Sequence, residues 1–277
     1  MHGLLTIMHL TWTEARRMRI TLASLICALL LLAVFGTAVY FMHLLGPGAI
    51  ARPAFIRHAQ LEALTLAGLY VANFLTLAFA VLLPVDSISG EIESGVIQTI
   101  ASKPVSRSTI VLGKWLAFLV MVAGYLLLVT LGVVLLVRLF TGFVPPHLAT
   151  ALPLLLLGAA TLLTLSIAGG TRLKTITNAI VVFGFYAIAF IGGWIETIGA
   201  VVGSDASRYI GTAISLVSPV DALWRLASHG MQSPLVQQLP GPFSAAAVPS
   251  EAMVVWSVGF VLATLLIALR GFRTRAL

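Results

Sequence analysis

The chain has 277 residues, of which 60% are hydrophobic and 9% charged, and its formal net charge is +7. Soluble domains carry about 25% charged residues, so this composition excludes an ordinary soluble protein and predicts a polytopic membrane protein with little aqueous domain. The basic residues are divided among chain ends and loops, without the dense basic and aromatic patch that nucleic-acid binding needs. We therefore expect no nucleic-acid partner.

Catalytic and metal chemistry have no sequence signature here. Cys27 is the single cysteine, so an internal disulfide is excluded, and no Cys/His cluster has metal-ligand spacing. No predicted span pairs a histidine with a suitable partner at membrane depth, as a membrane enzyme would require. We expect no catalytic residue, cofactor site or metal site in this chain.

Residues 1–19 are the first predicted element. Four apolar residues recur at spacings of three and four and share one helical face: Leu5, Met8, Trp12 and Ala15. Three basic residues follow: Arg16, Arg17 and Arg19. We predict an amphipathic helix on the inner membrane surface, marked by Met8, Trp12 and Arg16. The alternative is an unstructured basic tail that only sets topology.

Residues 20–277 form the predicted transmembrane domain, in an all-α fold. Six apolar segments reach the roughly 20 residues that a spanning helix needs: 20–45, 64–85, 109–137, 148–168, 176–195 and 252–269. The first is too long for the apolar part of a signal peptide, so we interpret it as a retained helix. With the N-terminus inside, eleven of the 16 Lys and Arg residues fall on the inner side, which predicts that both termini are cytoplasmic.

The outer segment 199–250 is the longest stretch between predicted spans. Its first part is apolar and its second part is rich in proline and glycine. We expect one or two short helices at or dipping into the outer leaflet, followed by an irregular loop.

Residues 86–114 read DSISGEIESGVIQTIASKPVSRSTIVLGK and are polar between two apolar spans. Apolar residues recur every fourth position from 88 to 100, which predicts a short helix with Asp86 as its N-cap. Pro104 ends that helix, Ser106 can cap the next, and Lys114 is predicted to anchor the following span at the inner interface. The residues alone support two interpretations of this segment equally, a helix that binds a partner and a solvated loop.

Nine positions of this segment follow a longer pattern in order: Asp86, Gly90, Glu91, Gly95, Pro104, Ser106, Arg107, Gly113 and Lys114. The pattern resembles the signature of ABC-2-type transporter permeases, although Val96 stands where that family usually has threonine. The amphipathic N-terminal helix, the six spans and the SPVD of residues 218–221 also fit. Within the family, the chain looks most like the permease of the copper-maturation system of nitrous-oxide reductase, partly through residues 219–226.

The resemblance implies a permease subunit of an ATP-binding-cassette transporter in a bacterial or archaeal cell (inner) membrane. Two copies would pair with two cytoplasmic ATPase subunits, which bind ATP and Mg, and a periplasmic accessory protein is a further candidate partner. Segment 86–108 would be the coupling helix in a groove of the ATPase, beside the N-terminal helix. The implied coupling residues are Asp86, Glu91, Glu93, Gly95, Lys103, Pro104 and Arg107. We expect Glu91 and Glu93 to meet basic groups of the ATPase, whereas Lys103 and Arg107 would pair with its acids or with lipid phosphates.

The ATPase itself is not expected in this chain. A P-loop requires G-x-x-x-x-G-K-[ST], but the single Gly-Lys pair, Gly113-Lys114, follows Ser108 at the first glycine position and precedes Trp115. We therefore expect no ATP hydrolysis by this chain alone.

Polar residues within or beside the spans are candidates for a substrate path: Asn73, Asn178 and Glu196. We favour a packing role for the two asparagines. We interpret Glu196 as an isolated acid at the membrane interface. The alternatives to a permease are an ion-coupled carrier or channel, and a polytopic membrane enzyme or accessory protein. The apolar spans suit lipids, peptides, drugs and sulfur species alike, so the sequence predicts no substrate.

Overall fold

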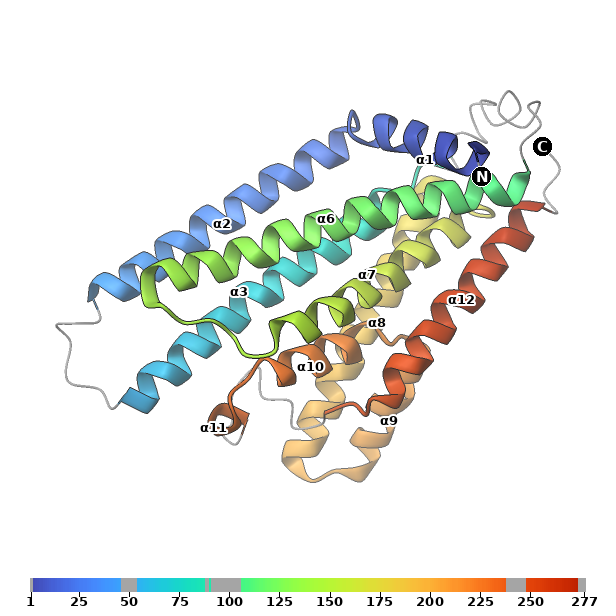
Figure 1. Ribbon diagram of the computed structural model, residues 1–277. Coiled ribbons are helices and arrows are strands. Elements are labelled where there is room, and N and C mark those ends of the chain that lie inside the picture. Colours follow the sequence, from blue (N-terminus) through green and yellow to red (C-terminus); the bar gives the residue numbers. More distant parts are fainter. Residues whose placement is uncertain (1, 46–53, 88–89, 91–105, 238–247, 274–277) are drawn as a thin grey trace.

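The computed structural model describes residues 2–45, 54–87, 90, 106–237 and 248–273, and every regular element in these ranges is a helix (Figure 1). Six of the described helices are long and apolar enough to cross a membrane: α2 (Arg19–Leu45), α3 (Ala54–Leu82), α6 (Arg107–Thr141), α7 (Leu148–Gly170), α8 (Thr175–Val202) and α12 (Ala252–Arg273). Within the described residues, the predicted all-α class is confirmed, with six helices that are candidates to span a membrane.

The second span is longer than predicted at its N-terminal end. α3 begins at Ala54 rather than at residue 64, because Glu62, which interrupts the apolar run, is accommodated inside the helix bundle. Glu62 is 5% exposed, and its Oε2 accepts a 3.1 Å hydrogen bond from the backbone N–H of Ser233. A buried carboxylate with a polar partner does not end a helix.

α6 has a defined cap at each end. Ser106 is extended and its side chain accepts a 3.2 Å hydrogen bond from the N–H of Thr109, so the predicted N-cap is confirmed. At the other end, Gly142 has φ of 73° and its N–H donates to the carbonyl of Arg138. A glycine adopts this left-handed conformation without steric cost.

α3 and α7 lie at the centre of the bundle and α2 lies at its edge. The apolar stretches of α3 and α7 are each 61% buried, whereas that of α2 is 17% buried. Ser166 of α7 donates a 3.0 Å hydrogen bond to the carbonyl of Val81, at the end of α3. Trp115 of α6 donates a 2.9 Å bond to the hydroxyl of Thr164. Such bonds hold neighbouring spans in register.

α1 (His2–Ala15) confirms the predicted N-terminal helix, and it packs against the start of α6. Its buried line is Ile7, Thr11 and Ala15, whereas Leu5 is 60% exposed. Leu5 therefore lies off the face that contacts α6, and its predicted contact with the membrane surface stays a prediction. Several stripes of this mostly apolar helix satisfy a spacing of three and four, and the contact with α6 selects one of them.

The outer segment forms α9 (Asp205–Val217), α10 (Val220–Gly230) and the short α11 (Pro234–Gln237). α9 folds back along α8, where Gly199 and Gly211 leave room for close contact. α10 packs against α7, and its Trp224 lies edge-on to Tyr70 of α3 with ring centroids 5.2 Å apart. The predicted short helices are present and pack onto the bundle.

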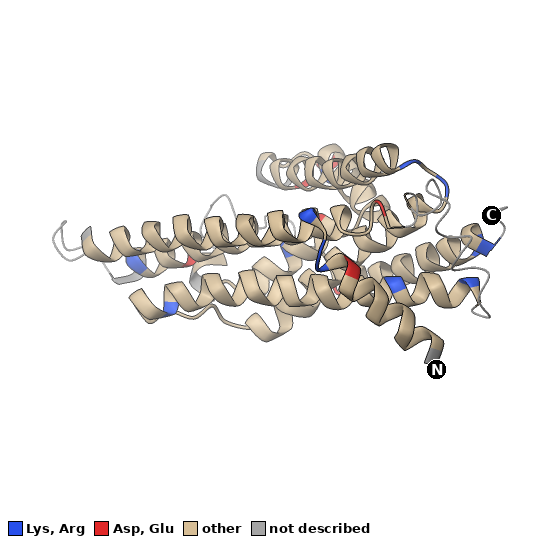
Figure 2. Cartoon of the chain, turned by 90° about the horizontal axis from the view of Figure 1, so that it is seen from above, with Lys and Arg blue, Asp and Glu red and all other residues tan. Residues whose placement is uncertain are grey.

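One end of the bundle, which we call the basic end, combines α1 with the α1–α2 turn, the start of α6, the α7–α8 turn and the last turn of α12. Figures 1 and 2 show this clustering of elements and of Lys and Arg residues. Its basic residues include Arg16, Arg17, Arg107, Arg172, Lys174, Arg270 and Arg273. α9, α10 and α11 lie toward the opposite end (Figure 1).

Candidate functional site

The residues predicted to couple the chain to a partner divide into two groups. Glu91, Glu93, Gly95, Lys103 and Pro104 lie outside the described residues. The described members of the pattern are Asp86, Gly90, Ser106, Arg107, Gly113 and Lys114. These flanking residues form the candidate site, and three of them, Asp86, Arg107 and Lys114, make hydrogen bonds to distant parts of the chain.

Lys114 is the most buried basic residue of this group, at 3% exposed. Its Nζ donates a 2.7 Å hydrogen bond to the backbone oxygen of Ser87, just beyond the end of α3. The Lys114 ammonium group therefore does not point to the outside of the bundle, and the predicted anchoring of α6 at the inner interface stays a prediction. The ammonium group is instead directed into the bundle, because it finds a carbonyl acceptor there that a lipid-facing position would lack.

Asp86 contacts the start of α8. Its Oδ1 accepts a 2.9 Å hydrogen bond from the hydroxyl of Thr175, the first residue of α8. A negative charge is favourable at the positive end of a helix dipole. Gly90 donates its N–H to the carbonyl of Asp86, and a side chain at Gly90 would collide with the Asp86 carboxylate. The four-residue spacing of this acid and glycine thus has a steric reason.

Arg107 contacts the end of α12. Its Nη1 donates a 3.3 Å hydrogen bond to the backbone oxygen of Arg273, the last residue of that helix. Free carbonyls at a helix C-terminus attract cations, so this contact is electrostatically favourable. The predicted alternatives for Arg107, acids of a partner or lipid phosphates, remain predictions.

Gly113 is the contact point between α6 and α1. A methyl group at Gly113 would lie 2.7 Å from Cγ2 of Ile7 and 3.4 Å from the carbonyl oxygen of Leu4. Only a residue without a side chain lets α1 approach α6 this closely. The Gly-Lys pair therefore serves two packing contacts, one with α1 and one with the end of α3.

A second polar cluster lies near the opposite end of the bundle, between α8, α9 and α10. Arg225 donates through Nη2 to Oε2 of Glu196 at 2.8 Å and through Nε to Oδ2 of Asp221 at 3.0 Å. The Arg225 side chain is 8% exposed, and each of the two carboxylates is 12% exposed. The prediction that Glu196 is an isolated interfacial acid is wrong, because the fold of α9 and α10 brings Arg225 to it.

Hydroxyl groups of α9 complete this cluster. Ser215 accepts a 3.1 Å hydrogen bond from Nη2 of Arg225, and Thr212 donates to Oε1 of Glu196 at 3.3 Å. Burial raises the pKa of the Asp221 carboxyl to about 6, an effect that Arg225 partly offsets and Glu196 reinforces. The sequence analysis did not predict this cluster, although the spacing of four between Asp221 and Arg225 is typical of a helical ion pair.

The two asparagines proposed for a substrate path are both buried. Asn178 is 0% exposed, and its Nδ2 donates a 2.7 Å hydrogen bond to the backbone oxygen of Ser166 in α7. It also fills the space beside Gly169, which supports the packing interpretation. Asn73 is buried in α3, and its part in a substrate path remains a prediction.

No group of three or more His, Cys, Asp or Glu residues that could hold a metal ion occurs within the described ranges. The cluster around Arg225 has two carboxylates, and both bind the guanidinium. The described contacts at the two sites are hydrogen bonds and, around Arg225, ion pairs.

Comparison of the chain with protein-family models and with curated proteins found no match.

Proposed function

We propose that the chain is the membrane-spanning permease subunit of an ABC-2-type ATP-binding-cassette transporter, nearest to the copper-maturation permease of the nitrous-oxide reductase type. The ordered pattern between Asp86 and Lys114 and the six apolar helices support this proposal. The proposed location is a bacterial or archaeal cell (inner) membrane, with the basic end facing the cytoplasm.

The observation that carries the proposal is the set of contacts made by the flanks of the proposed coupling segment, 86–108. Asp86 binds the start of α8, and Arg107 binds the end of α12. Lys114 joins the start of α6 to the chain following α3. A movement of this segment would therefore be transmitted to four spans at once, as a coupling element requires.

The proposed mechanism places a nucleotide-dependent motor outside the membrane. A separate ATPase pair would close on binding ATP and Mg, and the coupling segments of two permease copies would move with it. The hydrogen bonds at the basic end would pass that movement to α3, α6, α8 and α12. The bundle would thus shift between two arrangements that the partner's nucleotide state selects.

The test is a cross-linking experiment in membranes that also contain P-loop ATPases of the same host. A photoreactive residue at position 91 should capture a P-loop ATPase, with a yield that depends on ATP. The double substitution Glu91→Ala with Glu93→Ala should reduce capture through a photoreactive residue at position 103. The matched control is Asp205→Ala with Glu251→Ala, two exposed acids elsewhere in the chain. Equal capture by both pairs of variants would exclude segment 86–108 as the docking element.

ATP turnover supplies an independent test. The purified chain should hydrolyse no ATP, because it lacks a P-loop. Turnover that persists after all co-purifying proteins are removed would overturn the permease assignment.

A second candidate, an ion-coupled carrier, is favoured by the buried cluster of Glu196, Asp221 and Arg225. Carriers use buried carboxylates as proton or ion sites. Liposomes containing the chain alone, with a pH indicator inside, distinguish the two candidates. A carrier would dissipate an imposed pH gradient and lose this activity in Asp221→Asn, whereas a permease without its ATPase should leave the gradient intact.

A further inference from the structure

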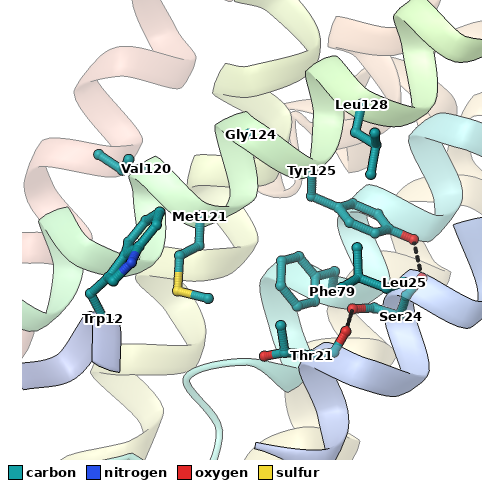
Figure 3. A pocket seen from close by; sticks show the side chains of 10 residues that line it. All are labelled: Trp12, Thr21, Ser24, Leu25, Phe79, Val120, Met121, Gly124, Tyr125 and Leu128. Atoms are coloured by element: carbon teal, nitrogen blue, oxygen red, sulfur yellow. Dashed lines mark hydrogen bonds between the residues drawn. The ribbon is translucent and has the colours of Figure 1, made fainter. Parts of the chain in front are cut away.

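A pocket of about 210 Å³ lies where α1, α2, α3 and α6 meet, next to the α1–α2 turn (Figure 3). Its lining residues are Trp12, Thr21, Ser24, Leu25, Phe79, Val120, Met121, Gly124, Tyr125 and Leu128. The pocket contains no part of the candidate coupling site and no residue of the Arg225 cluster.

The three hydroxyl groups in the pocket wall are already hydrogen-bonded. The Tyr125 hydroxyl donates to the backbone oxygen of Ser24 at 3.0 Å, and the Ser24 hydroxyl donates to the backbone oxygen of Thr21 at 2.9 Å (Figure 3). The Thr21 hydroxyl donates to the backbone oxygen of Ala15 at 2.6 Å. A polar occupant would therefore lose hydrogen bonds to water without gaining good partners, and the pocket favours hydrocarbon.

The pocket opens on the membrane-facing side of the bundle. Leu25 of α2 and Leu128 of α6 are 43% and 49% exposed, and Val120 is 45% exposed. Gly124 is exposed too, and a side chain there would meet no protein atom within 4 Å. A lipid chain can thus enter from the bilayer without displacing any part of the protein.

Three exposed arginines lie in the chain between two residues that line this pocket. Arg16, Arg17 and Arg19 occupy the turn and the first residue of α2, between the pocket residues Trp12 and Thr21. Figure 2 shows basic residues at this turn. Glu14, in the last turn of α1, is the neighbouring acid in the chain. The local charge is therefore net positive, directly beside an apolar cavity.

We propose that this junction binds one anionic phospholipid, with its phosphate on the basic turn and a segment of one acyl chain in the pocket. The basic turn and the adjacent apolar pocket match the two parts of a phospholipid, an anionic head group and the apolar acyl chain attached to it. Pockets that enclose a whole small molecule measure about 300–1,000 Å³, so this smaller one suits a chain segment whose remainder stays in the bilayer. The bound lipid would connect α1 to α2 and α6. This inference does not depend on the permease proposal.

The experiment uses native mass spectrometry of the purified full chain with phosphatidylglycerol and, separately, with phosphatidylcholine of the same acyl chains. Each arginine near an anionic lipid surface contributes roughly fivefold in affinity, so we expect phosphatidylglycerol to bind at least about tenfold more tightly. The triple substitution Arg16→Gln, Arg17→Gln and Arg19→Gln should remove this preference while leaving the weaker binding of phosphatidylcholine.

Gly124→Leu tests the pocket itself, because its side chain would occupy the cavity. The matched control is Gly184→Leu in α8, where a side chain also meets no protein atom within 4 Å. We expect Gly124→Leu to weaken the binding of both lipids and Gly184→Leu to leave it unchanged, with melting curves verifying that both variants fold. Equal affinity of the wild type for the two lipids would overturn the proposal. Unchanged lipid binding in Gly124→Leu would also overturn it. A third contrary result would be a dimer that Gly124→Leu disrupts and Gly184→Leu does not, because a second copy of the chain would then fill the pocket.

Discussion

Nζ of Lys114 and the backbone oxygen of Ser87 are joined by a 2.7 Å hydrogen bond, although 26 residues separate Lys114 from Ser87 along the chain. The bond joins α6 to the chain just beyond α3, on either side of the proposed coupling segment. Since the ammonium group is buried, this contact depends little on salt and should be one of the stronger polar bonds of the basic end.

Lys114→Met tests this bond, because methionine has a similar length and no charge. The carbonyl of Ser87 would lose its charged donor, and leaving such a buried group unsatisfied costs about 1–3 kcal/mol. We expect a lower melting temperature in detergent. Lys174→Met is the control, because Lys174 is exposed in the α7–α8 turn. This variant should have the same melting temperature as the wild type. An equal effect of both substitutions would contradict a specific role for the buried bond.

Gly113→Ala and Gly259→Ala should change stability in opposite directions. Both glycines lie inside spanning helices, where alanine is intrinsically favoured by about 1 kcal/mol. At Gly113 the new methyl group meets Ile7, whereas at Gly259 it meets no atom within 4 Å. Thermal melting should therefore show a lower melting temperature in the first variant and a slightly higher one in the second. Limited proteolysis should detect release of α1 only in Gly113→Ala.

Arg225→Met should be strongly destabilising, because it leaves Glu196 and Asp221 as buried carboxylates without their cation. Removing one partner of a buried ion pair typically costs about 3–5 kcal/mol. Arg208→Met is the matched control. Its pair with Asp205 is 3.6 Å long, with side chains 57% and 80% exposed, and such surface pairs contribute at most about 1 kcal/mol. Combining Arg225→Met with Glu196→Gln and Asp221→Asn should restore part of the lost stability.

The raised pKa of Asp221 predicts a pH dependence. The folded protein holds the Asp221 proton more tightly than the unfolded chain, whose carboxyl has the usual pKa of 3.8. This contribution to stability is fully present below pH 3.8 and is lost as the pH rises through about 6. Melting temperatures of the wild type and Asp221→Asn should therefore diverge between these values, with the wild type losing stability relative to the variant. A constant difference across this range would contradict the pKa assignment.

The sequence by itself determined the elements whose physical cause is local. Apolar length predicted the order of the six spanning helices, because a bilayer or a bundle core accepts only long apolar helices. The N-terminal helix and the Ser106 cap also followed from residues close together in the chain. Gly113 and Lys114 belong to the pattern found in the sequence, but their spacing alone did not predict which residues they contact.

Only the tertiary structure decided what the polar side chains contact. Lys114 lies inside the bundle because Ser87 offers a carbonyl there, and Glu196 is paired because α9 and α10 fold back along the spans. Leu5 is exposed because Gly113 admits Ile7 instead. Each of these outcomes depends on a partner distant in sequence. Helical periodicity fixes which residues share a face, but packing decides which face is buried and which charges meet.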